Sequence, residues 1–400
     1  MPEHTRSEGL RAAFEHPGLL FAGAAAFAMS TLFSAMKPVV LTRLLEETSW
    51  GAGLAGLVVA APFIGIAVSS LLFYFRPPRL GVGRLGRRFG SALVLLELAS
   101  AYVFASPVSL LLLQLGAGFC VGALMAATSR LVAVSTAPDE SFGFVDMSAV
   151  ALMSAMVAGV GFAVGVAGLR GAFLFAALLS FFYALVVARY RESPVLLAHH
   201  SRRHASLDIS WRPVATILMG VLFVTCSGLG FAFMFSLAAD LGLGYEQAGS
   251  RIGVLLLLSA LACQAGGWAS GRFGPRYPLL IGFIACASGW WFAVHASTPQ
   301  VFLAALVPAV FALQFNFPVL LALAGSLDEH GAWAGVAAPI ITSGFAWAAV
   351  VAGQLVEHLG LHSLPVATAL GMLACAALLV PATAAGATSR TGPGVRSAEG

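Results

Sequence analysis

The chain consists mostly of long apolar runs separated by short polar turns. About 20 apolar residues span the hydrocarbon core of a bilayer as an α-helix, so each run is long enough to cross it. Two of the runs are longer than one crossing needs, which predicts tilt or a helical extension beyond the bilayer. The pattern predicts an all-α integral membrane protein with twelve transmembrane helices. Their centres lie near Ala26, Val59, Leu98, Gly118, Val157, Leu178, Leu222, Leu257, Ala285, Val310, Ser343 and Leu373.

The composition supports this interpretation, because the chain has too little charge to cover a water-facing surface. Hydrophobic residues make up 59% of the chain and charged residues 10%. A soluble domain is charged at about a quarter of its positions. The first run, Gly18–Leu41, is too long for a signal peptide, its leader carries three glutamates, and no small-residue cleavage site follows. We therefore expect it to remain as the first spanning helix.

The arginines are concentrated in alternate loops, and this sets the predicted orientation. By the positive-inside rule, loops rich in Lys and Arg lie in the cytoplasm, so we expect both termini there. These residues would face anionic lipid, so the net charge of +4 does not indicate nucleic acid as a partner. The loops on the cytoplasmic side hold Arg76, Arg79, Arg84, Arg87, Arg88, Arg189, Arg191, Arg202, Arg203, Arg212, Arg272 and Arg276. The alternate loops hold little besides Arg43 and Arg170.

The sequence lacks the motifs of the common nucleotide, metal and hydrolase sites. The stretch GVGRLG at residues 81–86 fits the dinucleotide fingerprint, but it lies in a turn between two predicted membrane helices, with no strand before it. The only lysine, Lys37, is followed by Pro38 and cannot belong to a P-loop. The five cysteines form no C-x-x-C pair, and His358 and His362 fall in a short loop. We therefore expect no cofactor, no metal ion and no enzymatic activity.

The two halves of the chain resemble each other. VGRLGRRF (82–89) recurs as SGRFGPRY (270–277), and the pair Asp139-Glu140 recurs as Asp328-Glu329 at a nearly constant offset. This predicts a duplicated six-helix unit, with one bundle at 1–190, a cytoplasmic linker at 191–212 and a second bundle at 213–400. In transporters built from such repeats, the binding site lies near the midplane between the halves.

These turns also carry a resemblance to the major facilitator superfamily, whose signature turn reads roughly G-x-x-x-D-R-x-G-R-R. The first copy keeps Arg84, Gly86, Arg87 and Arg88 but has Gly83 in place of the Asp; the second keeps Gly267, Arg272, Gly274 and Arg276 but has Gly271 there. In the family that Asp helps to latch the cytoplasmic side, so the resemblance does not carry the latch over. GLRGAFLF (168–175) resembles the family's link between helices five and six. The resemblance implies two six-helix bundles that alternate access by rocking.

Ionisable residues at membrane depth are costly and are therefore the first functional candidates. Glu97 lies in the middle of the third span, where it is either a proton carrier or a structural partner for a neighbouring helix. Asp146 opens the fifth span and Arg130 closes the fourth near the same face, so the two form either a conformational latch or a coupling pair.

Lys37 shares one face of the first helix with Ser30 and Ser34, at spacings of i, i+4 and i+7. In the family this face points at the central cavity, where Lys37 would hold a carboxylate or phosphate. The alternative is a lysine that snorkels to the membrane interface.

The remaining candidates are neutral, and hydrogen bonding between helices is the more common role for each one alone. As a set they describe an aromatic cavity with few fixed charges, which suits an amphipathic organic molecule. They are Gln114, Thr225, Phe231, Phe235, Gln264, Gln314, Asn316 and Trp347.

The function predicted from these residues is secondary transport of a small, partly apolar organic molecule, with proton-coupled export favoured. The fifth helix lacks the Gly-Pro pair typical of proton-driven drug exporters in the family, which argues against a standard drug antiporter. One alternative is uptake or facilitated diffusion of an organic anion or sugar anchored by Lys37. Another is a receptor or assembly protein that has kept the fold and lost transport. The alanine-rich, nearly lysine-free composition indicates a bacterial plasma (inner) membrane, and we expect a monomer.

Overall fold

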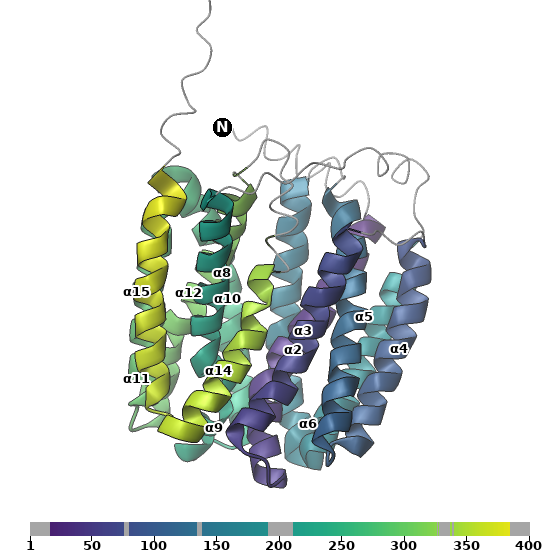
Figure 1. Cartoon of the computed structure of the whole chain (residues 1–400). Helices are drawn as coiled ribbons and strands as arrows, with labels where there is room; N and C mark the ends of the chain where they lie inside the picture. The colour runs from purple at the N-terminus through teal and green to yellow at the C-terminus, as the bar shows by residue number, and fades with distance from the viewer. Residues whose placement is uncertain are drawn as a thin grey trace, which may run out of the picture.

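The computed structural model describes residues 17–75, 80–133, 138–190, 211–325, 327, 337 and 340–384. The regular structure in these residues is helical throughout (Figure 1). Its elements are α2 (Pro17–Glu47), α3 (Ala52–Phe75), α4 (Val82–Val103), α5 (Pro107–Ala133), α6 (Pro138–Arg189), α8 (Trp211–Ala232), α9 (Met234–Asp240), α10 (Tyr245–Phe273), α11 (Arg276–Val294), α12 (Pro299–Gly325), α14 (Gly344–Leu359) and α15 (Ser363–Ala384).

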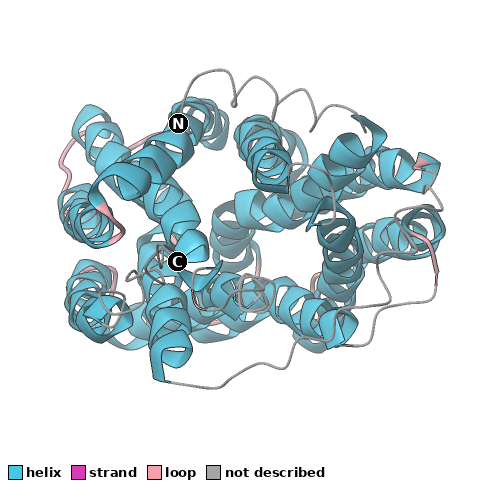
Figure 2. Cartoon of the chain, turned by 90° about the horizontal axis from the view of Figure 1, so that it is seen from above, coloured by secondary structure: helices cyan, strands magenta, loops and turns pink. Residues whose placement is uncertain are grey.

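Ten of these helical segments are long and apolar enough to cross a membrane. α4 is as long as the others, but Arg84, Arg87, Arg88 and Glu97 lower its hydropathy. α6 is 52 residues long, which is enough for two crossings, and α8 with α9 forms one interrupted span. The helix axes run roughly parallel when the molecule is seen from above (Figure 2). The prediction of an all-α membrane fold is therefore confirmed.

The chain reverses direction inside α6. Ala167 leaves helical geometry, and Gly168 adopts φ 59°, ψ −150°, a conformation that a residue with a Cβ rarely tolerates. The backbone N–H of Leu169 then donates to Oε1 of Glu47 at 3.0 Å, which satisfies one of the open amides at the start of the returning helix. The stretch beginning at Gly168 was expected to link the fifth and sixth helices, and this break lies there.

The first helices and the last helices pack mainly among themselves, and the two groups meet along two seams. One seam joins α3 to α14, and the other joins α6 to α10. In Figure 1, α4 and α5 lie on one side and α11, α12 and α15 on the other, with α2, α3 and α14 between them. We keep 1–190, 191–212 and 213–400 as the proposed division into two bundles and a linker; residues 191–210 of that linker lie outside the described residues.

Glycines allow the backbones to touch along both seams. A Cβ on Gly56 would lie 2.5 Å from the carbonyl oxygen of Ala349, and one on Gly353 would lie 2.4 Å from that of Ala52. On the other seam, a Cβ on Gly249 would lie 2.9 Å from the carbonyl oxygen of Val157. Small residues are what permit such close helix contacts in membranes. The seams are therefore closed to any larger side chain while the helices keep these positions.

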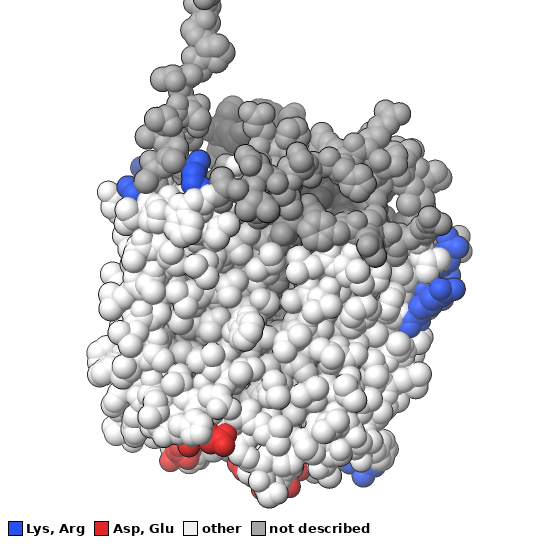
Figure 3. Space-filling view, viewed as in Figure 1, with Lys and Arg blue, Asp and Glu red and all other residues white. Residues whose placement is uncertain are grey.

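The two ends of the bundle differ in charge. One end, here called the acidic end, carries Glu46, Glu47, Asp240 and Glu357, and the opposite arginine end carries Arg84, Arg87, Arg88, Arg272 and Arg276. Figure 3 shows acidic side chains gathered at the lower edge and most of the visible basic ones above. Pro17 and Ala384, the first and last described residues, both lie at the arginine end. That this end faces the cytoplasm stays a prediction from the positive-inside rule.

Candidate functional site

Lys37 lies in the interior of the bundle, at the level where the two halves meet. It is 1% exposed, and its Nζ atom has no hydrogen-bond partner among the described residues. Three phenyl rings surround it, with ring centres 5.6 Å (Phe63), 5.6 Å (Phe231) and 5.1 Å (Phe345) from Nζ. Phe63 comes from α3 in the first half, whereas the other two come from α8 and α14 in the second. Lys37 therefore does not snorkel to an interface; it is a buried cation in an aromatic cage.

The local sequence explains how α2 holds this lysine. Ser30 and Ser34 are each 8% exposed, so the predicted polar face of the helix is turned inward with Lys37. Pro38 lies inside α2 and has no N–H to offer the carbonyl of Ser34, which weakens the helix next to the lysine. Helix α2 continues because Thr42 and the residues beyond it pack against α6 and α9.

A small cavity opens beside Lys37. Its volume is about 20 Å³, which is room for about one water molecule. A substrate larger than water therefore needs the two halves to separate at this level. The cavity is lined by Phe33, Met36, Lys37, Val40, Val58, Val59, Pro62, Gln114 and Phe173.

Glu97 and Gln114 form a second buried polar group, and Gln114 connects it to the cavity. Glu97 is 0% exposed. The amide Nε2 of Gln114 lies 3.4 Å from Oε2 and 3.5 Å from Oε1 of Glu97, and it donates to Ser100 Oγ at 3.0 Å. Ser100 in turn donates to the carbonyl oxygen of Leu96 at 2.9 Å. The structure thus joins two candidates, Glu97 and Gln114, that lie 17 residues apart in the sequence.

Asp146 is half-buried on the first passage of α6, the helix that packs against α10. The side chain of Arg130 lies outside the described residues. The proposed pairing of Asp146 with Arg130 therefore stays a prediction.

Most of the neutral candidates hold helices together. Thr225 Oγ1 donates to Val221 O at 2.8 Å and lies 3.3 Å from Gly344 O, which joins α8 to α14. Asn316 Nδ2 donates to Leu279 O at 3.3 Å, between α12 and α11. Gln314 Oε1 accepts from the Cys263 thiol, with 3.9 Å between Sγ and Oε1. These contacts favour the helix-packing interpretation for all three residues.

The remaining candidates lie in three different places: in the cage around Lys37, near the acidic end, and on the outer surface. Phe231 belongs to the cage around Lys37, and Phe235 is buried nearer the acidic end, where its ring stacks on Tyr245 at 6.1 Å. Gln264 is exposed and Trp347 is 57% exposed, because their helix faces turn away from the core. We therefore leave Gln264 and Trp347 out of the proposed site.

The two copies of the signature turn play different structural roles. A Cβ on Gly83 would lie 2.3 Å from the carbonyl oxygen of Tyr190, and one on Gly86 would lie 2.8 Å from the backbone nitrogen of Ala188, so both glycines let α4 start against the end of α6. Arg84, Arg87 and Arg88 are exposed beside them.

In the second copy, a Cβ on Gly271 would meet nothing within 4 Å, and Gly274 ends α10 with φ 73°. Arg272 lies over the ring of Trp268 at 5.9 Å. Arg276 Nε donates to Thr383 Oγ1 at 2.5 Å, which ties the start of α11 to the end of α15.

Because the two turns are packed differently, replacing the glycine with the family's Asp should lower the stability of the protein in the first turn and leave it unchanged in the second. Gly83→Asp should lower the melting temperature of the purified protein by several degrees, because overpacking against the Tyr190 carbonyl costs about 1–3 kcal/mol. Gly271→Asp, which has open space, should melt within about a degree of the wild type. Equal melting temperatures for the two variants would contradict the packing described for Gly83.

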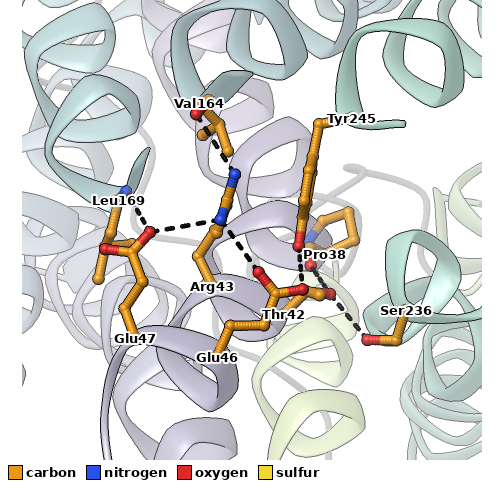
Figure 4. A network of polar contacts seen from close by, with 9 residues as sticks. All are labelled: Pro38, Thr42, Arg43, Glu46, Glu47, Val164, Leu169, Ser236 and Tyr245. Atoms are coloured by element: carbon orange, nitrogen blue, oxygen red, sulfur yellow. Dashed lines mark hydrogen bonds and ion pairs between the residues drawn. The ribbon is translucent and has the colours of Figure 1, made fainter. Parts of the chain in front are cut away.

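The sequence did not single out a polar network that closes the acidic end (Figure 4). Tyr245 donates its hydroxyl hydrogen to Glu46 Oε1 at 2.6 Å, and Thr42 Oγ1 lies 2.8 Å from Ser236 Oγ. The Arg43 guanidinium lies 3.1 Å from Glu46 and 3.7 Å from Glu47, and 4.2 Å from the centre of the Tyr245 ring.

A third contact across the halves involves Glu357 of α14. The backbone N–H of Gly53 donates to its Oε2 atom at 2.5 Å, at the start of α3. The acidic pair at the end of the first span was the only sequence signal for this network. The network's contacts between the two halves join residues 194 to 304 positions apart, and no local pattern reveals such a pairing.

Comparison with known proteins agrees with this architecture. A family model described as Major Facilitator Superfamily matches residues 19–338. The nucleoside transporter NupG has a TM-score of 0.69 and 12% sequence identity, covering 92% of this chain and 98% of its own. A D-xylose-proton symporter has a TM-score of 0.68 and 16% identity, covering 94% and 97%.

A bacterial homologue of the human lysosomal transporter Spinster, in an inward-facing and unoccupied conformation, has a TM-score of 0.65 and 14% identity, covering 96% of each chain. Identities this low show a shared fold and nothing about substrate. No curated protein sequence matches the chain.

Proposed function

The chain belongs to the major facilitator superfamily, and from this premise we propose that it carries a small amphipathic organic anion with Lys37 as the anchor. Membership makes it an integral membrane transporter of small molecules rather than an enzyme. The anchored anion, its coupling and its direction are the parts that we propose.

The buried Lys37 Nζ atom, which has no hydrogen-bond partner among the described residues, is the observation that carries the proposal. A buried ion without a partner costs several kcal/mol after relaxation. The three rings lie 5.1 to 5.6 Å from Nζ, near the outer limit of about 6 Å for cation–π attraction, so they offset only part of that cost. A carboxylate in contact with Nζ would offset the rest, while the rings and the aliphatic wall would hold an apolar body. Among the substrates expected from the sequence, this favours the organic anion anchored by Lys37.

The cage is shared between the halves, which fits alternating access. Lys37 and Phe63 belong to the first half, and Phe231 and Phe345 to the second. An anion bound at Lys37 would contact both halves at once and be released when they rock apart. The seam contacts at the acidic end supply one of the two closures that such a cycle needs.

Proton coupling is proposed at Glu97, with Asp146 as the second candidate. Glu97 is buried at membrane depth and has no basic partner among the described residues. One structural neighbour is a proton symporter, so coupling to protons is a mechanism that this fold supports. The direction of secondary transport is set by the combined gradients of the substrate and the coupled ion. The export expected from the sequence and the alternative of uptake can therefore use the same site. We also propose that the protein is a monomer in a bacterial plasma membrane, with its arginine end in the cytoplasm.

The test compares carboxylate substrates with their neutral amides, which have nearly the same shape. Purified protein in liposomes would be given benzoate or phenylacetate, and benzamide or phenylacetamide, and counterflow of the labelled compound measured. We expect the carboxylates to be transported at least about tenfold faster than their amides, because only they neutralise Lys37. Equal transport of acids and amides would contradict the anion anchor. Binding without flux in either direction would favour the receptor alternative.

A further inference from the structure

We propose that Gln114 transmits the protonation state of Glu97 to the substrate cavity by turning its side-chain amide over. This inference rests on the proposed function, because it explains how a proton at Glu97 would control anion binding at Lys37. Gln114 both hydrogen-bonds to Glu97 and lines the cavity beside Lys37.

The observed hydrogen bonds fit an ionised Glu97. A carboxylate can only accept hydrogen bonds, and the Gln114 NH₂ group is turned toward it and toward Ser100. The Oε1 atom of Gln114 is then the polar end that these two groups leave free. In this proposal the oxygen lies toward the cavity that Gln114 lines, where an acceptor rather than a donor disfavours an anion.

Protonation of Glu97 reverses the kind of hydrogen-bond partner that this side chain requires. A proton that adds to a carboxylate oxygen of Glu97 makes an O–H donor, which needs an acceptor in the same place. Turning the amide by half a rotation presents Oε1 to Glu97 and moves NH₂ toward the cavity. Ser100 can follow, because its hydroxyl either accepts from Nε2, as observed, or donates to Oε1. Leaving the amide unturned would place two donors against each other in a buried site, which is costly.

The turn has a defined effect on the substrate. In the protonated state the cavity offers an anion two donors, Lys37 and the Gln114 amide, and the negative charge of Glu97 is gone. Both changes favour anion binding, so a proton and an anion would be carried together. By linkage, anion binding would favour protonation of Glu97 to the same extent.

No charged side chain among the described residues forms an ion pair or hydrogen bond with Glu97, whose side-chain hydrogen bonds are with Gln114. On α2, Lys37 lines the cavity that Gln114 also lines. The other titratable residues of α4 and of its neighbours α5 and α6 are Arg84, Arg87, Arg88, Tyr102, Cys120, Arg130, Asp139, Glu140, Asp146, Arg170, Tyr183 and Arg189; the side chains of Arg130, Asp139 and Glu140 lie outside the described residues.

Infrared difference spectroscopy after a pH step tests the amide without any substrate. The full-length wild type should show a protonated carboxyl band and a shifted Gln side-chain amide band together. Glu97→Gln should lose both changes, and Gln114→Met, which has a similar length and no amide, should keep the carboxyl band alone. A carboxyl band in the wild type without an amide change, or no carboxyl band at all, would overturn the proposal.

Benzoate affinity supplies the second readout. In the wild type it should rise about tenfold for each unit of falling pH where Glu97 titrates. Glu97→Gln should bind with the wild type's acid-limit affinity at every pH, and Gln114→Met should show a clearly smaller change than the wild type, because only the effect of the Glu97 charge remains. Gln300→Met, at an exposed position, is the matched control and should behave as wild type.

A Gln114→Met protein with the full wild-type pH dependence would overturn the amide turn. If benzoate does not bind the wild type, the proposed function fails at that point, while the infrared result still decides the role of Gln114. Melting curves of all variants exclude loss of fold as the cause of either result.

Discussion

Lys37→Met is expected to abolish anion transport and, at the same time, to raise the melting temperature. Met has nearly the length of Lys and no charge, so it fills the same space in the aromatic cage. Losing contact with a buried charge typically costs about 2–5 kcal/mol of binding, which predicts at least about a 30-fold loss of benzoate affinity.

Stability should move the other way, because the empty protein loses an uncompensated ion. The three rings lie near the outer limit for cation–π attraction, so each contact that Met removes contributes less than the about 2 kcal/mol of a close desolvated contact, against several kcal/mol for the unpaired charge. The balance predicts a net gain of about 1–2 kcal/mol, or a few degrees in a melting scan. A lysine kept for structural reasons would give the opposite sign.

Lys37→Arg is the matched control, since it keeps the charge and changes the shape. It should retain benzoate binding within about tenfold of the wild type, because the guanidinium still neutralises the carboxylate. Measuring counterflow and melting temperature on all three proteins decides the matter. Full transport by Lys37→Met, or a fall in its melting temperature, would contradict the role assigned to this residue.

Gly249→Leu is expected to stop transport by holding the acidic end open. A Cβ at Gly249 already lies 2.9 Å from the Val157 carbonyl oxygen and 3.2 Å from the Cα atom of Gly161, so a leucine cannot fit between α10 and α6 in this state. Each half keeps its own core, and the protein should still fold. Turnover requires closure of this seam in every cycle, so we expect at least about a 100-fold loss of counterflow, equal to about 2.7 kcal/mol.

Gly267→Leu provides the control on the same helix, because a Cβ there meets nothing within 4 Å. It should transport as the wild type does. The state of the seam can be read from Ser236→Cys, whose side chain lies beside Thr42 when the end is closed. Adding Gly249→Leu should make this cysteine react with a membrane-impermeant maleimide several-fold faster, whereas Gly267→Leu should not. Unchanged labelling together with normal transport would show that the seam is not a gate.

The local sequence was sufficient to predict the helices but not their interactions. The apolar runs centred near Val157 and Leu178 each indicated a span, and Gly168 indicated the reversal between them. The face shared by Ser30, Ser34 and Lys37 was predicted to turn inward, and all three are buried. Whether Trp347 or Phe345 pointed inward could not be read, because α14 is apolar around most of its circumference.

Contacts between helices could be identified only in the folded chain. Glu97 and Gln114 were both candidates, but their contact depends on how α4 and α5 are set against each other. Glu46, Tyr245 and Glu357 each resemble an ordinary polar residue at a helix end. Gly83 was read as a missing Asp, whereas the structure shows that the carbonyl of Tyr190 occupies the space that such a side chain would need.

The sequence by itself was enough to predict that the chain lies in a lipid bilayer, that it is helical, and which family it resembles. The first two follow from the apolar runs and from the cost of leaving backbone amides unpaired in hydrocarbon, and both act within one segment at a time. The family follows from the resemblance of the two turn motifs. The tertiary structure alone decided that the single lysine has three rings around it and no counter-ion among the described residues, and that Gln114 both bonds to Glu97 and lines the cavity. Those facts depend on distances between residues tens to hundreds of positions apart, which the packing of whole helices sets and no single segment encodes.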